Sequence, residues 1–170
     1  MLDTCSSLLD ADQYDKVVKC CDEYLKMKPK SGPAWHLKGL AYQKKGDTAK
    51  AYESFEKAAE IDRTEPANYY AIGMLLYNEG KFENALHTFQ ICNVLVPRIE
   101  HYFMIAVSCI MLNRQEDAEV ALRTAITLDK KKTVSVMEQF FNKNYKNDKT
   151  TSEEEKVALK AVIDKLAKSK

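Results

Sequence analysis

The chain has few of the residues that interrupt helices, with only four Pro and five Gly in 170 residues. No segment alternates apolar and polar side chains over several residues, which excludes ordinary half-buried β-strands. No apolar run approaches the roughly 18 residues that a membrane-spanning helix requires. Apolar residues make up 45% of the composition and charged residues 30%. The sequence therefore predicts an all-α, soluble protein without a membrane span.

A strong charge of one sign is also absent. The formal net charge is +1, so no global basic field points to nucleic acid. The charge is uneven, because residues 130–170 hold eleven Lys and six acidic residues. A basic segment of this kind suits an acidic partner, nucleic acid or a membrane surface, but it is more often a solvated helix surface. We therefore expect no nucleic-acid partner.

The chain lacks the residue spacings of catalytic and metal sites. No Cys-x-x-Cys motif occurs, and His36, His87 and His101 are scattered without a Cys, Ser or paired carboxylate at a catalytic spacing. The N-terminus has neither the basic start nor the apolar stretch of a signal peptide. We predict no enzyme activity, no metal, no cofactor and a reducing, cytoplasmic location. We also expect free and mostly buried thiols at Cys5, Cys20, Cys21, Cys92 and Cys109.

What the chain does have is a repeat of 33 or 34 residues. Its opening pattern aligns Trp35, Gly39 and Tyr42 with Tyr69, Gly73 and Leu76, and then with Tyr102, Ala106 and Cys109. Its second half aligns Ala51, Phe55 and Ala58 with Ala85, Phe89 and Cys92, and then with Ala118, Leu122 and Ala125. Between the two halves, Gly46 aligns with Gly80 and Asn113, and Pro29 aligns with Arg63 and Pro97.

Close packing of paired helices explains this pattern. Helices approach to about 8–10 Å only where the contacting side chains are small. We expect Gly39 and Gly73 to provide that closeness, with Trp35 and Tyr69 filling space against the Phe of the second helix. Gly46 and Gly80 stand where a left-handed C-terminal cap is expected. Pro29 and Pro97 mark the exit of a second helix.

A repeat of this length and order resembles the tetratricopeptide repeat family, over about 130 residues. The resemblance implies a right-handed superhelix of stacked antiparallel helix pairs. The expected repeats are a partial first one at about 1–31, then 32–65, 66–98 and 99–131, followed by C-terminal capping helices in 132–170. The expected helices are 2–9, 14–27, 33–45, 48–61, 67–79, 82–95, 100–112 and 115–129.

The last forty residues contain two further apolar stripes. The first lies on a predicted helix at 133–145, with Ser135 and Glu138 as a possible capping box. The second lies on a predicted helix at 152–168, which opens at Ser152 and Glu155. We expect the first helix to cap the array. For the second, capping, filling the groove and binding a partner all remain open.

In this family the first helices of the repeats line a concave groove that holds bound peptides. The resemblance therefore implies an apolar and aromatic groove that binds a protein or peptide partner, and it implies an adaptor or scaffold function. The matching positions are Leu37, Leu40, Tyr70, Met74, Tyr77, Phe103, Met104, Val107 and Met111. Coverage of this surface by the chain itself or by a second copy is the alternative.

One subclass of the family binds chaperone carboxylates through a clamp of Lys, Arg and Asn. The positions that match this clamp hold His36, Leu40, Ala71, Glu100 and Met104, or, one repeat earlier, Leu2, Ser6, Leu37, Ala67 and Ala71. Neither set is basic, so we predict no clamp. Residues 81–122 also look somewhat like the bacterial type III secretion chaperones, which hold hydrophobic segments of a client. A chaperone of that kind and a self-associating scaffold are the alternative functions.

Overall fold

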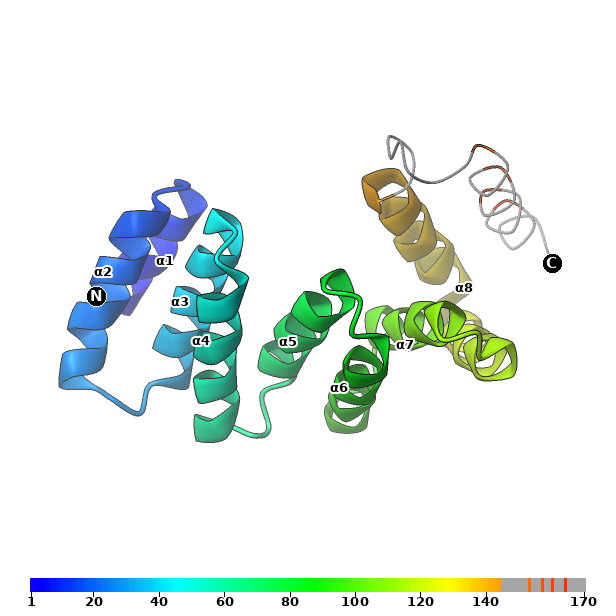
Figure 1. Cartoon of the computed structure of the whole chain (residues 1–170), viewed down its shortest axis with the longest axis horizontal. Helices are drawn as coiled ribbons and strands as arrows, with labels where there is room; N and C mark the ends of the chain where they lie inside the picture. The colour runs from blue at the N-terminus through cyan, green and yellow to red at the C-terminus, as the bar shows by residue number, and fades with distance from the viewer. Residues whose placement is uncertain (145–152, 154–156, 158–159, 161–163, 165–170) are drawn as a thin grey trace. The chain divides into compact units, whose positions relative to one another are not determined.

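The computed structural model describes residues 1–144 and residues 153, 157, 160 and 164. The described part contains eight α-helices and no strand. It divides into two compact units, the N-terminal unit Met1–Val96 and the C-terminal unit Pro97–Lys170 (Figure 1). None of its helices is both long enough and apolar enough to cross a membrane. The all-α prediction is confirmed.

The N-terminal unit is a series of antiparallel helices, each packed on the next along the chain (Figure 1). α1 also contacts α3, so first helices of successive repeats meet. The bounds agree with the expected ones within one or two residues: α1 Leu2–Asp10, α2 Tyr14–Met27, α3 Gly32–Lys45, α4 Thr48–Ile61, α5 Pro66–Asn78 and α6 Phe82–Leu95.

The predicted left-handed caps are confirmed. Gly46 has a φ of 78° and Gly80 a φ of 74°, a backbone conformation that L side chains rarely adopt. At the same position in the other two repeats, Asp12 and Asn113 also have a left-handed backbone, with φ values of 56° and 58°. Asx side chains tolerate this conformation better than most others. Each repeat therefore turns between its two helices in the same way, although only two of the four use glycine.

The close approach at Gly39 and Gly73 is also present. A Cβ placed on Gly39 would lie 2.6 Å from Cε1 of Phe55, and a Cβ on Gly73 would lie 2.6 Å from Cε1 of Phe89. Carbon atoms attract best at about 3.5–4.0 Å. The ring of the second helix therefore occupies the space that any side chain at this position of the first helix would need.

The predicted aromatic partners of these phenylalanines are wrong by one residue. Phe55 contacts the ring of His36, at a centroid distance of 5.2 Å, and Phe89 contacts Tyr70, at 5.7 Å. One residue along a helix turns the side chain by about 100°. The Trp35 ring instead has two lysine ammonium groups near it, with Nζ of Lys57 4.6 Å and Nζ of Lys38 4.9 Å from its centroid.

The prediction of five free thiols is wrong at two positions. Cys5 and Cys20 form a disulfide that joins α1 to α2, with their Cα atoms 5.6 Å apart. The antiparallel pairing of these helices brings together residues 15 positions apart, which the spacing alone did not indicate. Because the thiols are not all free, cysteine usage no longer supports a reducing compartment.

The other three cysteines, Cys21, Cys92 and Cys109, form no disulfide and are buried, as predicted. Burial raises the pKa of Cys21 to about 11 and that of Cys92 to about 12.

The C-terminal unit contains α7, Ile99–Met111, and α8, Gln115–Asn144. α8 is broken at Asp129, whose φ of −163° and ψ of 103° are not helical. Asp129 starts the second half of the helix, because its carboxylate accepts the Lys132 N–H at 2.9 Å. The predicted capping box at Ser135 is wrong, because Ser135 lies inside the helix and its hydroxyl accepts from the Gln139 side chain.

The predicted helix at 152–168 falls mostly outside the described residues. Glu153, Val157, Lys160 and Asp164 are helical, and Lys160 Nζ lies 3.4 Å from Glu138 of α8. The division between the two compact units falls at 96/97, whereas the sequence divides repeats from capping helices at 131/132. The capping function of 132–170 stays a prediction.

Candidate functional site

The N-terminal unit contains a pocket on the side where its first helices meet. Its volume is about 440 Å³, within the usual range for ligand sites. α1, α3 and α5 all contribute to it, together with the connection before α5. We call it the inner pocket; it is lined by Leu2, Asp3, Ser6, Gly32, Pro33, His36, Leu37, Asp62, Glu65, Ala67 and Asn68.

A hydrogen-bonded pair connects two walls of the inner pocket. His36 Nδ1 of α3 and Asn68 Oδ1 of α5 lie 2.7 Å apart. Asn68 is only 2% exposed, and His36 packs its ring on Phe55. The packing that begins at Gly39 therefore positions Phe55, then His36, and through His36 the buried amide of Asn68.

Three carboxylates line the inner pocket: Asp3, Asp62 and Glu65. The Asp62 carboxylate accepts hydrogen bonds from the Thr64 backbone N–H and hydroxyl, which hold the pKa of Asp62 below its ordinary value. The Glu65 carboxylate caps α5 by accepting the Ala67 N–H at 3.1 Å. The pocket is therefore lined by acidic side chains from α1 and from the connection before α5.

Sequence reasoning missed this pocket. Leu2, Ser6 and Ala67 match positions of the basic clamp, and because none of them is basic, no charged site was expected there. The acidic residues lie one position from these or in the connection between helices. A signal did exist, because Asn68 is an amide at a helix position that aligns with the apolar Ala34.

The predicted groove residues of the N-terminal unit lie on its first helices. Leu37 lines the inner pocket and also packs on the core formed with α1 and α2. Tyr70 and Tyr77 rest on Phe89 and Phe82, each leaving part of its surface in solvent. The five partly exposed residues are Leu37, Leu40, Tyr70, Met74 and Tyr77.

The C-terminal unit differs from the prediction. Phe103, Met104 and Val107 were expected to be exposed in the groove, but their exposed fractions are 5%, 2% and 8%. The reason is that α8 packs against α7 and places Phe140 5.1 Å from the ring of Phe103. The expected exposure of these three is wrong. Met111, at the end of α7, is 46% exposed.

A second hollow, of about 470 Å³, lies in the C-terminal unit. It is lined mainly by apolar side chains of α7 and of the first half of α8: Ile110, Gln115, Ala118, Glu119, Leu122, Arg123 and Ile126. In the described residues no group of three His, Cys, Asp or Glu side chains is close enough to hold a metal ion.

Comparison with known proteins gives one match to a family model and one to a curated protein. The model of the tetratricopeptide repeat matches residues 32–65 and 66–92. The general transcriptional corepressor ssn6 of Schizosaccharomyces pombe is 28% identical over 102 residues, which are 59% of this chain. The chain spans only 9% of the length of that relative.

Solved structures of MamA have the same fold. One MamA crystal structure superposes with a TM-score of 0.72 at 16% identity, covering 96% of this chain and 88% of that chain. A MamA RS-1 double mutant gives a TM-score of 0.74 at 14% identity, covering 97% and 91%. The 34-residue spacing, the left-handed turn in each repeat, the glycine–phenylalanine contacts and these matches agree: residues 32–92 are tetratricopeptide repeats, and the described chain has the fold of an array of such repeats.

Proposed function

We propose that this protein is a non-enzymatic adaptor or scaffold that binds a segment of a partner protein on the face formed by α1, α3 and α5. The observation that carries the proposal is that three successive first helices contribute to one pocket. A repeat array that leaves this face open offers a continuous surface to an extended or helical segment.

The side chains of this face support binding of an adaptable kind. Tyr70, Met74 and Tyr77 lie one helical turn apart along α5, and each is partly exposed. Aromatic residues and Met are enriched in the centres of protein interfaces. Met also adapts its shape to different ligands. A partner segment is therefore expected to place apolar side chains along α5.

The absence of catalysis is part of the proposal. The inner pocket contains one histidine, and its Nδ1 is engaged by Asn68 rather than by a nucleophile. A chaperone that holds hydrophobic client segments, like those of type III secretion, is a variant of the same proposal. It would use the same face for longer apolar segments.

A double substitution on α5 tests the proposal. Tyr70→Glu/Met74→Glu places two charges on the face, and capture of crosslinked partners from native lysate should fall at least about tenfold because apolar contact is lost. The matched control is Met27→Glu/Val94→Glu, which adds the same charges at exposed positions outside this face. Capture should be measured by quantitative mass spectrometry.

Folding has to be checked because Tyr70 packs on Phe89. Met74→Glu alone leaves that ring contact in place and should still lower capture. Circular dichroism should show native helicity for every variant. Equal capture by Met74→Glu and the control pair would refute binding at this face.

Self-association is a second candidate, which exposed apolar residues of the C-terminal unit favour. Ile110, Met111, Val120 and Leu128 are each about half exposed or more. Exposed apolar clusters often mark interfaces between proteins. Light scattering across a range of concentrations tests this candidate, and Val120→Lys/Leu128→Lys should shift the protein toward monomer.

A further inference from the structure

α1 has few local features that stabilise it as a helix. It is nine residues long, none of the described residues caps its N-terminus with a side chain, and Cys5 is its one buried residue. Isolated helices shorter than about 12–15 residues are marginal in water. The position of α1 therefore depends on its packing against α2 and α3 and on the disulfide from Cys5 to Cys20.

α1 closes one small core of the N-terminal unit. Leu8 and Leu9 pack against this core from α1. The fully buried members of the core are Cys5, Val17, Cys21 and Ala41. Because Cys21 of α2 shares the core with Cys5 of α1, departure of α1 opens the core that contains the Cys21 thiol.

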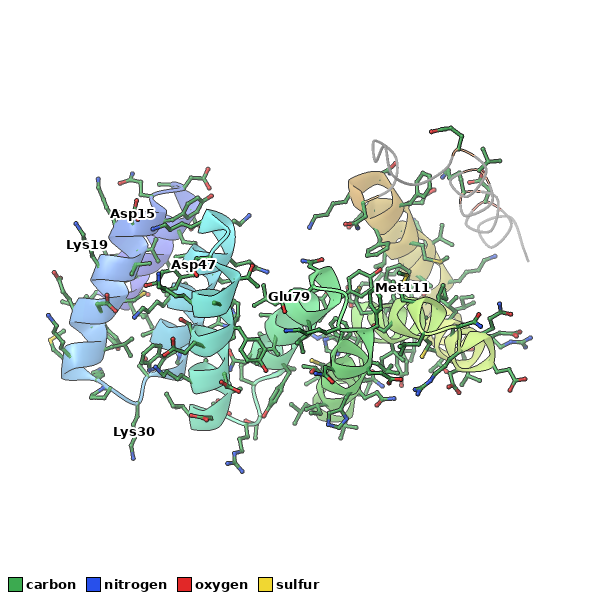
Figure 2. The ribbon with its side chains drawn as sticks, in the orientation of Figure 1. Asp15, Lys19, Lys30, Asp47, Glu79 and Met111 are labelled. Carbon is green, nitrogen blue, oxygen red and sulfur yellow. A yellow bond between two sulfur atoms is a disulfide. The ribbon has the colours of Figure 1, made fainter. Side chains whose placement is uncertain are left out.

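One of the two bonded sulfurs is accessible from solvent. In Figure 2 the exposed side chain of Lys19 points outward from α2. Successive residues of a helix are turned by about 100°, and along α2 Cys20 is partly exposed while Cys21 is buried. Cys5 is fully buried. A thiolate from solvent therefore reaches Sγ of Cys20, with the Cys5 sulfur as the leaving group.

We infer that the Cys5–Cys20 disulfide is a redox switch, which a dithiol reductant opens and which then releases α1 from α2 and α3. A thiolate of the reductant attacks Sγ of Cys20, the bond between the two protein sulfurs breaks, and Cys5 leaves as a thiolate. The second thiolate of the reductant then displaces the Cys20 sulfur. The reductant becomes a disulfide, and its two protons end on Cys5 and Cys20.

Release of α1 changes the proposed binding face. α1 is one of the three helices that form this face. Leu37 of α3 lines the same face and also packs on the core under α1. The oxidised protein therefore presents the complete face, and the reduced protein presents α3 and α5 without α1. This consequence rests on the proposed function, whereas the release of α1 does not.

The Cys21 thiol reports whether α1 is in place. Burial raises the pKa of Cys21 to about 11, so that the reactive thiolate is rare while the core is closed. An exposed cysteine has a pKa of about 8.5. Cys92 of α6 is the matched control in the same unit, because it is fully buried, has a pKa raised to about 12 and lies outside the core under α1.

Alkylation of the full chain by N-ethylmaleimide at about pH 8, followed by peptide mass spectrometry, tests the switch. Reduction with dithiothreitol, which is removed before labelling, should raise the alkylation rate of Cys21 at least about tenfold over the oxidised protein. The rate of Cys92 should change little.

A variant without the disulfide gives the same test without a reductant. Cys5→Ser/Cys20→Ser should show the fast alkylation of Cys21, and dithiothreitol should not change its rate. Slow alkylation of Cys92 in this variant shows that the rest of the unit is folded.

Three results would overturn the switch. The first is alkylation of Cys5 and Cys20 in the oxidised protein, because it shows that they are not bonded. The second is an equal Cys21 rate in the oxidised and reduced protein, because α1 then stays in place without its disulfide. The third is an equal rise at Cys21 and Cys92, because reduction then unfolds the whole unit.

Capture of the partner separates this inference from the proposed function. Cys5→Ser/Cys20→Ser should lower capture in the crosslinking assay roughly fivefold, because α1 leaves the face. Capture that falls with Met74→Glu but not with this variant supports the face and refutes its control by the disulfide. Fast alkylation of Cys21 on reduction, with capture unaffected by Met74→Glu, refutes the proposed face and supports the release of α1.

Discussion

α5 of the N-terminal unit and α7 of the C-terminal unit occupy the same place in the repeat but have different surroundings. Tyr70 and Met74 of α5 are partly exposed, whereas Phe103 and Val107, 33 residues further on, are buried. The difference comes from α8, whose second half turns at Asp129 and packs on α7. The repeat position sets the direction of a side chain, and the next helix decides whether that direction leads to solvent.

The same comparison applies to polar residues. Asn68 of α5 and His101 of α7 are at equivalent positions, and both are buried. Near Asn68 the chain leaves a pocket with acidic residues, and in the C-terminal unit it places an apolar helix against α7. The face is therefore partly exposed in one unit, while the other uses the corresponding face for its own core.

The largest expected loss of stability comes from removing the Phe103 ring, which α8 covers. Phe103→Ala should cost about 3–5 kcal/mol of unfolding free energy, because the ring is buried against Phe140. Tyr70→Ala should cost roughly half as much, since part of that ring is already in solvent. Urea denaturation measures both losses. Similar costs for the two variants would show that the two faces are equally covered.

Reduction of the disulfide should have the next largest effect, in the N-terminal unit alone. Opening a 15-residue loop removes about 3 kcal/mol in the chain-entropy model. The reductant should therefore increase hydrogen exchange in α1 and α2 and leave α7 unchanged. Cys5→Ser/Cys20→Ser should reproduce the effect, and Cys109→Ser, which removes a thiol outside the disulfide, serves as the control. Unchanged hydrogen exchange in α1 on reduction would contradict a stabilising role of the disulfide.

A smaller loss of stability is expected at a helix contact that uses different residues in the two units. Gly73 faces Phe89 in the N-terminal unit, while Ala106 and Leu122 hold the same repeat positions in the C-terminal unit. Gly73→Ala should cost about 1–3 kcal/mol through overpacking, partly offset by the better helix propensity of alanine.

Adding Phe89→Leu should recover part of that loss, measured as a coupling energy in a double-mutant cycle. Additive losses in the double variant would show that the ring and the glycine do not depend on each other.

The smallest expected effect is the loss of stability at acid pH. Acid should destabilise both units. The hydrogen bond from Lys50 lowers the pKa of Asp47. For Glu100 burial is the largest single effect and raises the pKa. The hydrogen bond and charge of Lys132, a backbone N–H and the nearby His101 together outweigh it, so that this pKa is lowered as well. A lowered pKa stabilises the folded state above the unfolded value of about 4, and this contribution is lost as the pH falls through the folded value.

Melting temperatures between about pH 6 and pH 2.5 measure this dependence. Asp47→Asn and Glu100→Gln should each make the decline on acidification shallower. A steeper decline in either variant would contradict a lowered pKa of the carboxyl that it removes.

Most of the fold could be predicted from local sequence signals. Helix bounds followed from proline, glycine and the apolar period, because these residues act within one or two turns of their own position. The break in α8 was predicted as well, since the expected helices 115–129 and 133–145 lie on either side of it. The cap at Asp129 was not predicted, because no glycine or proline marks its extended backbone. The site could be predicted only in part: Leu37, Leu40, Tyr70, Met74 and Tyr77 lie on partly exposed helix faces, but three residues of α7 do not.

The sequence by itself determined that this chain is a repeat of paired helices, because a small residue opposite a ring every 33 or 34 positions allows few other packings. Only the tertiary structure decided which repeat faces stay open, which cysteines are joined and where the acidic pocket forms. These properties depend on residues far apart in the chain, as between Asp3 and Glu65 or Phe103 and Phe140, and no local pattern encodes their proximity.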